Sequence, residues 1–225
     1  NGEGLGGAYV SGAMARKDAL GLTVETFDPG ALASRFPMFS LPRDHQGWFE
    51  PRDAGYVNPR ALVRAQIAIA KQQGVSILRQ TASKVFDSGS GVEVETLDGQ
   101  HYMAEKVVVA AGGFTNMADI LPVTVDMAAT GRTIAFFELD AQKQQAFAGM
   151  PSTIVLAENE DDIVYILPPV RYPDGKVYLK IGGESEKGRL ETLDQAIRWF
   201  HSDGTASEVD FLVRRAIELM PALDG

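Results

Sequence analysis

The chain has 225 residues, of which 45% are hydrophobic and 23% charged, which is typical of a globular protein with one sizeable core or two smaller ones. Its formal net charge of -9 argues against nucleic acid and against an anionic membrane as partners, since both need clustered basic residues. The absence of cysteine excludes disulfides, thiolate metal ligands and cysteine nucleophiles and fits a cytoplasmic protein, and no run approaches the roughly 20 apolar residues of a membrane span.

The first part of the chain predicts helices with clear start signals. Apolar residues between Tyr9 and Leu20 recur near helical spacing, and a short alternation from Leu22 to Glu25 indicates a strand. Asp28 followed by Pro29 combines an N-cap residue with proline at the first helical position. The same signal opens the segment from Asn58 to Gly74, where an apolar stripe predicts the best-defined helix of the chain.

A series of strands is expected next. The segments Val75 to Leu78 and Thr81 to Phe86 are short and apolar, and Val92 to Glu95 alternates strictly before the turn dipeptide Asp98-Gly99. The run from Lys106 to Gly113 is continuous, β-branched and closed by glycines. This pattern predicts a strand buried on both faces, with close backbone approach at its end.

The second half predicts an antiparallel sheet followed by helices. The expected strands are Arg132 to Glu138, Thr153 to Leu156, Ile163 to Leu167 and Lys176 to Ile181. Asp174-Gly175 favours a tight turn between the last two strands. Helices are expected from Leu193 to Phe200 and from Thr205 to Leu219, and the second opens with a capping-box pattern from Thr205 to Glu208.

The order of these pieces resembles the D-amino-acid oxidase superfamily of FAD-dependent oxidoreductases, most closely its branch of monomeric sarcosine and N-methyl amino-acid oxidases. The likeness is carried by short clusters along almost the whole chain: Arg35 to Pro37, Phe49 to Pro51, Gly55, Tyr56, Asn58 to Gly74, Phe86-Asp87, Glu95-Thr96, Lys106 to Gly113, Phe136 to Glu138 and Met220-Pro221. The resemblance implies an α+β fold with a largely antiparallel sheet and helices on one side. Residues 1–53 and 115–225 would form a substrate-binding domain, and 54–114 an incomplete part of an α/β FAD-binding domain.

The resemblance also implies a missing piece. The family's Gly-x-Gly-x-x-Gly motif follows a first strand, whereas Gly4 to Gly7 follows none, so we do not take it for that motif. The chain is therefore expected to be an internal fragment that lacks the N-terminal FAD-binding segment of the same protein, which leaves a sheet edge to be covered. The contacts that it would still make to FAD lie at Ser83 and at Ala111, Gly112 and Gly113. Alone, it is expected to bind FAD weakly and to turn nothing over.

The substrate site follows from the same resemblance, although no catalytic residue is singled out. Tyr165 takes the place of a tyrosine that contacts the substrate, and its phenol could hydrogen-bond a carboxylate. Glu184 takes the place of a histidine beside the substrate in sarcosine oxidases, and a carboxylate there would repel a substrate carboxylate. Lys180 is a candidate carboxylate anchor, and Arg132 could clamp a carboxylate bidentately.

Other interpretations of these residues stay open. Tyr165 could be an ordinary sheet tyrosine, and the charged candidates could be solvated side chains. His45, His101 and His201 lack metal-ligand spacing, and the acidic stretch from Glu158 to Asp162 lacks the calcium-loop pattern, so no metal site is expected. The expected partner is a small, sarcosine-like amine or amino acid. The alternatives are a related flavoprotein that oxidises a hydroxy acid or glycerol phosphate, and a non-catalytic ligand-binding or interaction domain.

Overall fold

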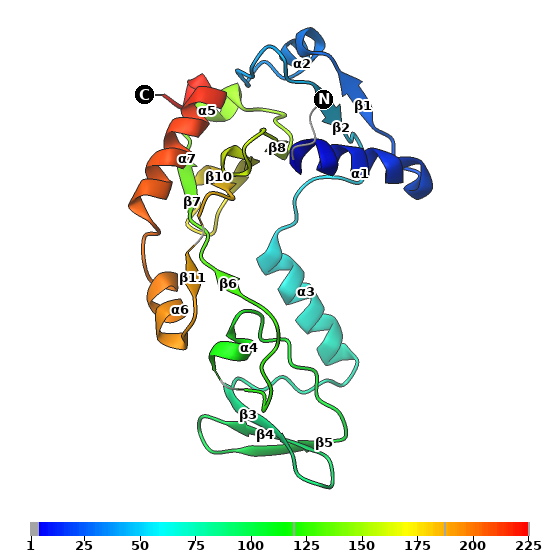
Figure 1. Cartoon of the computed structure of the whole chain (residues 1–225), viewed down its shortest axis with the longest axis vertical. Coiled ribbons are helices and arrows are strands. Elements are labelled where there is room, and N and C mark those ends of the chain that lie inside the picture. The colour runs from blue at the N-terminus through cyan, green and yellow to red at the C-terminus, as the bar shows by residue number, and fades with distance from the viewer. Residues whose placement is uncertain (1–4, 119, 187, 225) are drawn as a thin grey trace. The chain divides into compact units, whose positions relative to one another are not determined.

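The computed structural model describes residues 5–118, 120–186 and 188–224. Its fold is a mixture of helices and strands, and every strand pair among these residues is antiparallel, as the expected fold class requires. The chain divides into two compact units (Figure 1). The first takes its described residues from Asn1–Tyr56, Arg132–Lys187 and Asp203–Gly225, and the second from Val57–Gly131 and Gly188–Ser202.

A four-stranded sheet forms the centre of the first unit. Its strands lie in the order β7, β10, β9 and β8. Their bounds are Ile134–Glu138 for β7, Thr153–Val155 for β8, Val164–Arg171 for β9 and Val177–Gly183 for β10. Gly175 has a φ of +88°, so the tight turn between β9 and β10 uses the backbone freedom that the Asp-Gly pair predicted. All four expected strands form, although β9 continues to Arg171, four residues beyond its expected end at Leu167.

The core of the first unit lies between one face of this sheet and helix α7 (Ala206–Leu219). Because alternate side chains point to opposite faces, Val164 and Ile166 of β9 and Leu179 and Ile181 of β10 share the buried face, and each is 0% exposed. Leu212 of α7 is equally buried against them. Burial of each such side chain contributes about 1.5–3 kcal/mol.

The N-terminal part of the first unit contains α1 (Leu5–Leu20), β1 (Glu25–Phe27), α2 (Pro29–Arg35) and β2 (Gly47–Phe49). Asp28 caps α2 by accepting a hydrogen bond from the Ala31 amide, as its sequence predicted. The expected strand from Leu22 to Glu25 is displaced to β1, because the pairing with β2 begins at Glu25 opposite Phe49. The first unit also contains α5 (Ala141–Ala146), η1 (Glu160–Asp162) and η2 (Pro221–Leu223).

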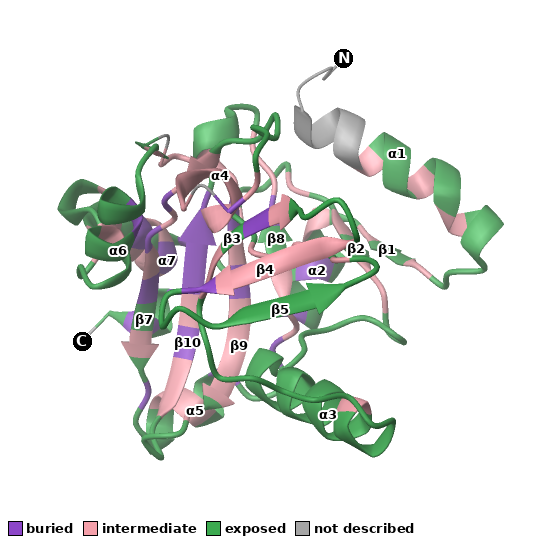
Figure 2. Ribbon diagram, turned by 90° about the horizontal axis from the view of Figure 1, so that it is seen from below, coloured by how far each residue is buried: buried purple, intermediate pink, exposed green. Residues whose placement is uncertain are grey.

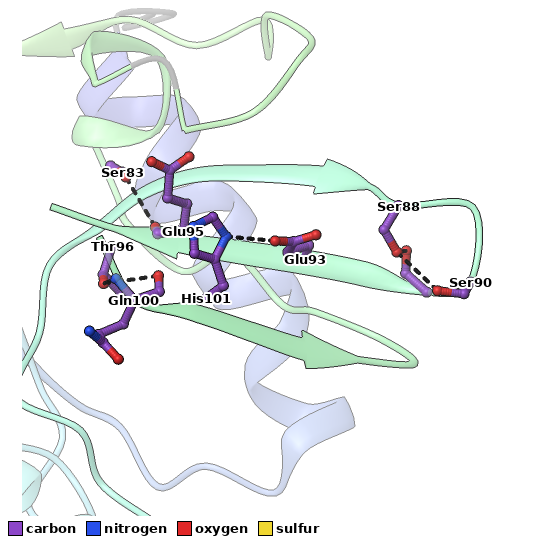
Figure 3. Close-up of polar contacts among 9 residues, drawn as sticks. Ser83, Ser88, Ser90, Glu93, Glu95, Thr96, Gln100 and His101 are labelled. Carbon is purple, nitrogen blue, oxygen red and sulfur yellow. Dashed lines mark hydrogen bonds and ion pairs between the residues drawn. The ribbon is translucent and has the colours of Figure 1, made fainter. Parts of the chain in front are cut away.

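A three-stranded meander lies in the second unit. Its strands are β3 (Ala82–Asp87), β4 (Val92–Thr96) and β5 (His101–Ala104). Gly99 in the turn between β4 and β5 has a φ of +77°, which confirms the hairpin expected at Asp98-Gly99. Figure 3 shows polar contacts along this meander, including Nδ1 of His101 at 2.6 Å from Oε1 of Glu93.

The rest of the second unit consists of short elements around a helix. They are α3 (Pro59–Gln72), α4 (Phe114–Met117), β6 (Ala129–Thr130), β11 (Arg189–Leu190) and α6 (Leu193–Phe200). Asn58 caps α3 through its side chain, so this expected helix is confirmed together with its start signal. Helix α6 begins with a true capping box between Thr192 and Gln195.

Two expected strands of the second unit do not form. The segments Val75 to Leu78 and Lys106 to Gly113 have no strand partner among the described residues, and they run as irregular backbone. Val108, expected to be buried on both faces, is 90% exposed. The prediction was wrong for this structure because β-branched composition favours a buried strand but cannot supply the neighbouring strand that a ladder requires.

The apolar stripe of α3 is also uncovered. None of the residues of α3 is buried, and Figure 2 shows the helix green, meaning exposed, along most of its length. Leu62, Val63 and Ile69 are 44%, 51% and 55% exposed. An amphipathic helix ordinarily buries such a stripe against a partner, so the described part of the second unit has an apolar face without one.

The functional division of the chain at residues 53 and 114 stays a prediction, and the second compact unit has its own bounds at 57–131 and 188–202. The Gly4 to Gly7 segment lies partly outside the described residues, since α1 begins at Leu5. Among the described helices, none combines the length and the apolar character that a membrane crossing requires.

Candidate functional site

The face of the four-stranded sheet that points away from α7 gathers several of the predicted substrate residues. We call it the open face, and its residues are Ile134, Phe136, Glu138, Ile154, Tyr165, Leu167, Tyr178, Lys180 and Gly182. Phe136 and Ile154 are 48% and 54% exposed, whereas their neighbours on the opposite face are in the core. The open face thus combines apolar side chains with the polar side chains of Tyr165 and Lys180, while Glu138 and Tyr178 at its other end are hydrogen-bonded to Lys176 and Asp174.

Tyr165 stands on β9 directly opposite Gly182 of β10. Partial burial raises the pKa of its phenol, and the negative charge of Glu184 adds to the rise. The phenol is therefore a neutral hydrogen-bond donor at physiological pH. Within the described residues its hydroxyl makes no hydrogen bond, which leaves it available to a ligand.

Lys180 is the diagonal neighbour of Tyr165 on the open face. It lies opposite Leu167 of β9 and Phe136 of β7, two residues before Gly182. Diagonal positions on one face are about 7–8 Å apart, which is within reach of long side chains. The ammonium group of Lys180 has no ion pair or hydrogen bond inside the described part of the chain. Lys180 and Tyr165 are therefore neighbours on the open face, and neither has a polar partner among the described residues.

Arg132 and Glu184 are brought together, but not as expected. Arg132 lies at the entry to β7 and Glu184 follows β10, and Nη2 of Arg132 is 3.1 Å from Oε2 of Glu184. Nη1 of Arg132 donates to the backbone carbonyl of Glu186. The guanidinium therefore already serves the loop after β10 and is not an open carboxylate clamp. It also offsets the charge of Glu184, so the repulsion of a substrate carboxylate by Glu184 is weaker than expected.

Glu186 holds this loop to the start of α7 and is a residue that sequence reasoning missed. Its carboxylate accepts hydrogen bonds from the Thr133 amide at 2.5 Å and from the Thr205 hydroxyl at 2.6 Å. Partial burial alone would raise the pKa of Glu186, but the hydrogen bonds from Thr205 and Thr133, together with the charge of Arg132, lower it below its usual 4.5. The loop that carries Glu184 is thereby fixed to the sheet.

The same contacts explain why the capping box expected from Thr205 to Glu208 is absent. Thr205 is the N-cap residue of α7, but its side chain accepts no cap hydrogen bond, and its hydroxyl is directed to Glu186, to which it donates. Glu208 accepts a hydrogen bond from the hydroxyl of Ser185. Both side chains of the motif are therefore engaged by the loop after β10.

Glu186→Gln is expected to destabilise the chain by about 1 kcal/mol at pH 7, a value reduced for partial exposure. A carboxyl with a lowered folded-state pKa stabilises the fold above its unfolded-state pKa, and that contribution disappears as the pH falls through the folded-state pKa. Urea unfolding at pH 7 and at pH 3 measures this difference. We expect the gap between wild type and variant to shrink at the lower pH, and a gap that is constant or grows would contradict the assignment.

The predicted cofactor residues Ala111, Gly112 and Gly113 form a turn before α4. Gly112 has a φ of +56°, and Ala111 and Gly112 accept hydrogen bonds from the amides of Phe114 and Thr115. The backbone N–H groups of Ala111, Gly112 and Gly113 donate to no group among the described residues. Such neighbouring unpaired N–H groups can bind an anion, and a Cβ at Gly112 would meet no atom within 4 Å.

An apolar pocket of about 340 Å³ adjoins this turn within the second unit. Gly113 lines it together with Phe114, Trp199 and Phe200, and the rings of Phe114 and Phe200 stack with centroids 5.9 Å apart. Unpaired N–H groups beside an apolar aromatic pocket fit part of a flavin, which joins a phosphate-bearing chain to a flat ring system.

Ser83 is not joined to this turn. Its hydroxyl donates to the Glu95 carbonyl at 3.1 Å, at the irregularity where the register of β3 against β4 shifts (Figure 3). No hydrogen bond among the described residues links Ser83 to residues 111–113. A contact between Ser83 and the cofactor stays a prediction. The hydroxyl already donates a hydrogen bond to the Glu95 carbonyl, which does not favour such a contact.

The described residues contain no group of three or more His, Asp or Glu side chains that could hold a metal ion. The acidic stretch that includes Glu160, Asp161 and Asp162 forms η1, which Asn159 caps through a hydrogen bond from the Asp161 amide. Nδ1 of His45 lies 3.4 Å from Oδ1 of Asp44, and Nδ1 of His101 lies 2.6 Å from Oε1 of Glu93. These side chains have structural partners within the chain.

In a comparison with known protein families, one family matches nearly the whole chain. The family described as FAD dependent oxidoreductase matches residues 7–225. Monomeric sarcosine oxidase of Bacillus sp. (strain B-0618) is 26% identical over 154 residues, 68% of this chain and 39% of that protein. N-methyl-L-tryptophan oxidase of Yersinia pestis (strain Pestoides F) is 29% identical over 164 residues, 72% of this chain and 42% of that protein. The chain thus spans less than half the length of these relatives.

Solved structures show the same fold. NikD, an unusual amino acid oxidase essential for nikkomycin biosynthesis, matches with a TM-score of 0.65 and 21% identity, over 95% of this chain and 53% of its own. Glycine oxidase from Geobacillus kaustophilus matches with a TM-score of 0.60 and 19% identity, over 92% of this chain and 49% of its own.

Proposed function

The chain belongs to the family of FAD dependent oxidoreductases, and on that premise we propose that it forms the substrate-binding part of an oxidase. The proposed substrate is a small amino acid or N-methylated amino acid, oxidised at its carbon–nitrogen bond. Two relatives are named for sarcosine and for N-methyl-L-tryptophan. Both of these compounds have a carboxylate next to the amine.

The observation that carries the proposal is the pair of available polar groups on the open face. Lys180 and Tyr165 are neighbours there, and neither side chain has a polar partner among the described residues. An ammonium and a phenolic hydroxyl together match the charge and the acceptor atoms of a carboxylate. Exposed Phe136 and Ile154 supply apolar surface for the rest of the molecule.

The Arg132–Glu184 pair would sit beside the bound substrate and leave little net charge there. A substrate carboxylate is therefore directed to Lys180, and the Glu184 carboxylate remains near the amine. In this arrangement Lys180 and Tyr165 bind and orient the substrate, and Arg132 holds Glu184 in place. Orientation of the reacting carbon is the contribution that a protein makes when the chemistry belongs to a cofactor.

FAD is the cofactor of the family. When bound, it supplies a hydride acceptor for the carbon next to the nitrogen and passes the electrons on to oxygen. The residues of this chain that would hold part of it are those of the 111–113 turn, through their unpaired N–H groups. Ser83 would approach it only if its hydroxyl left the Glu95 carbonyl.

We further propose that the FAD-binding segment of the same protein covers the apolar face of the second unit. That face is the apolar stripe of α3, and the segment would also cover the exposed side chain of Val108. Strands supplied by such a segment would give residues 106–110 the ladder that their composition favours. On this proposal the chain by itself binds FAD weakly and has no activity, and its cytoplasmic location stays a prediction.

A substrate screen of the complete gene product tests this function. Sarcosine, glycine and N-methylated amino acids should bleach the flavin anaerobically, while carboxylate-free amines such as dimethylamine should do so far more slowly. If hydroxy acids or glycerol phosphate reduce the flavin and amino acids do not, the related-flavoprotein alternative holds. A product that binds amino acids without any flavin would support the non-catalytic alternative.

A further inference from the structure

Gly182 is a position of the open face where an added side chain would have to displace its neighbour, Tyr165. A Cβ built on Gly182 would lie 2.5 Å from Oη, 2.6 Å from Cζ and 2.8 Å from Cε1 of Tyr165. Real Cβ atoms essentially never approach other heavy atoms this closely. The phenol ring therefore lies across the backbone of β10, in the space that the missing side chain leaves.

Backbone conformation does not explain this glycine. Gly182 is in the regular pairing of β10 with both β7 and β9, and its φ lies outside the left-handed region. Any residue could adopt that conformation, and glycine in a strand interior lowers stability by roughly 0.5–1 kcal/mol. The next residue provides a contrast, since a Cβ on Gly183 would make its closest contact at 3.3 Å, with the Ile163 carbonyl oxygen.

Packing alone sets the direction of the Tyr165 side chain. Its hydroxyl has no hydrogen-bond partner among the described residues that could hold the ring. The ring is instead placed by the slot over Gly182, which comes two residues after Lys180 and two residues before Glu184 in the chain. The direction of the Tyr165 hydroxyl on the open face thus depends on Gly182, a residue without a side chain.

We propose that Gly182 is a positioning residue that sets substrate specificity, because its missing side chain forms a slot that holds Tyr165 flat on the open face beside Lys180. This inference rests on the proposed function for its catalytic consequence. A methyl group at position 182 would push the phenol off the sheet, away from Lys180 and into the volume that the substrate occupies. Large substrates then lose more than small ones, and the hydroxyl no longer reaches the carboxylate.

The test is a double-mutant cycle of Gly182→Ala and Tyr165→Ala, with Gly188→Ala as the matched control because a Cβ there meets no atom within 4 Å. Thermal unfolding of the protein should show a Tm lowered by about 5 °C for Gly182→Ala when Tyr165 is present. In the Tyr165→Ala background the same change should lower Tm by less than about 1 °C, and Gly188→Ala should be neutral. An equal decrease in Tm in both backgrounds, or no decrease in either, would contradict the proposal that Gly182 forms a slot for Tyr165.

Kinetics of the complete protein test the specificity. Gly182→Ala should lower kcat/KM for an N-methylated aromatic amino acid at least about tenfold more than for sarcosine, mainly through KM. Equal losses for the two substrates overturn the inference. If the unfolding cycle shows the coupling but the protein oxidises no amine at all, the proposed function fails while the slot stands, so the two failures are distinguishable.

Discussion

Lys180→Met is expected to lower kcat/KM of the complete oxidase for sarcosine by about 30- to 150-fold. The ammonium is the one cation that we place on the open face without an internal partner among the described residues. A charge-assisted hydrogen bond to a carboxylate is worth about 2–3 kcal/mol, and each 1.4 kcal/mol is about tenfold. Methionine keeps most of the apolar stem of lysine, so the loss would report the charge more than the packing.

Lys176→Met is the matched control for this change. Lys176 precedes β10, and its ammonium lies 2.6 Å from Oε2 of Glu138, away from Tyr165. We expect its removal to leave kcat/KM within about twofold, since an exposed ion pair is worth little. The decisive comparison is with a substrate that lacks the carboxylate, for which Lys180→Met should cause a much smaller loss. Equal losses with and without the carboxylate would contradict the anchoring role.

Ile69→Glu is expected to destabilise the complete protein by about 3 kcal/mol or more and to leave this chain alone nearly unaffected. Ile69 is 55% exposed on α3. If a flavin-binding segment covers this stripe, the glutamate would be buried without a partner, which is among the most destabilising single changes. In the isolated chain the same side chain remains in water. Urea unfolding of both forms measures the difference.

Arg64→Glu provides the control on the polar side of the same helix. Arg64 is exposed, and it precedes Ile69 by five residues, so the two side chains project in different directions. The control should change the stability of both forms by less than about 0.5 kcal/mol. An Ile69→Glu protein that is as stable as wild type in the long form would show that nothing covers α3.

The parts of the fold that sequence predicts well are those with local causes. Asp174-Gly175 supplies the turn between β9 and β10, so the antiparallel pairing of these two strands follows from the chain itself. The shared face of Tyr165 and Lys180 does not follow from the turn alone, because the register of β9 against β10 shifts between Tyr178 and Lys180. The start of α3 at Asn58-Pro59 is equally local.

The predictions that failed concern features that depend on residues far away in the sequence. The run from Lys106 to Gly113 has the composition of a central strand, but composition does not tell which segment lies beside it. Thr205 begins a sequence that matches the capping-box pattern, but its hydroxyl is directed to Glu186, which lies 19 residues earlier in the chain. The Gly182-Gly183 pair looks like a strand end, and only the position of the Tyr165 ring shows why the first glycine is needed. Alternation could have indicated that Gly182 shares the face of Lys180, but not that a ring crosses it.

The absorbance spectrum and intact mass of the complete product of this gene, recorded beside those of the purified chain of 225 residues, test the proposed function most directly. We predict a longer, yellow protein with flavin bands and about one FAD per chain, and a colourless short chain. A natural product of 225 residues without flavin, or a longer one that is colourless and takes up no FAD, would contradict the proposed function.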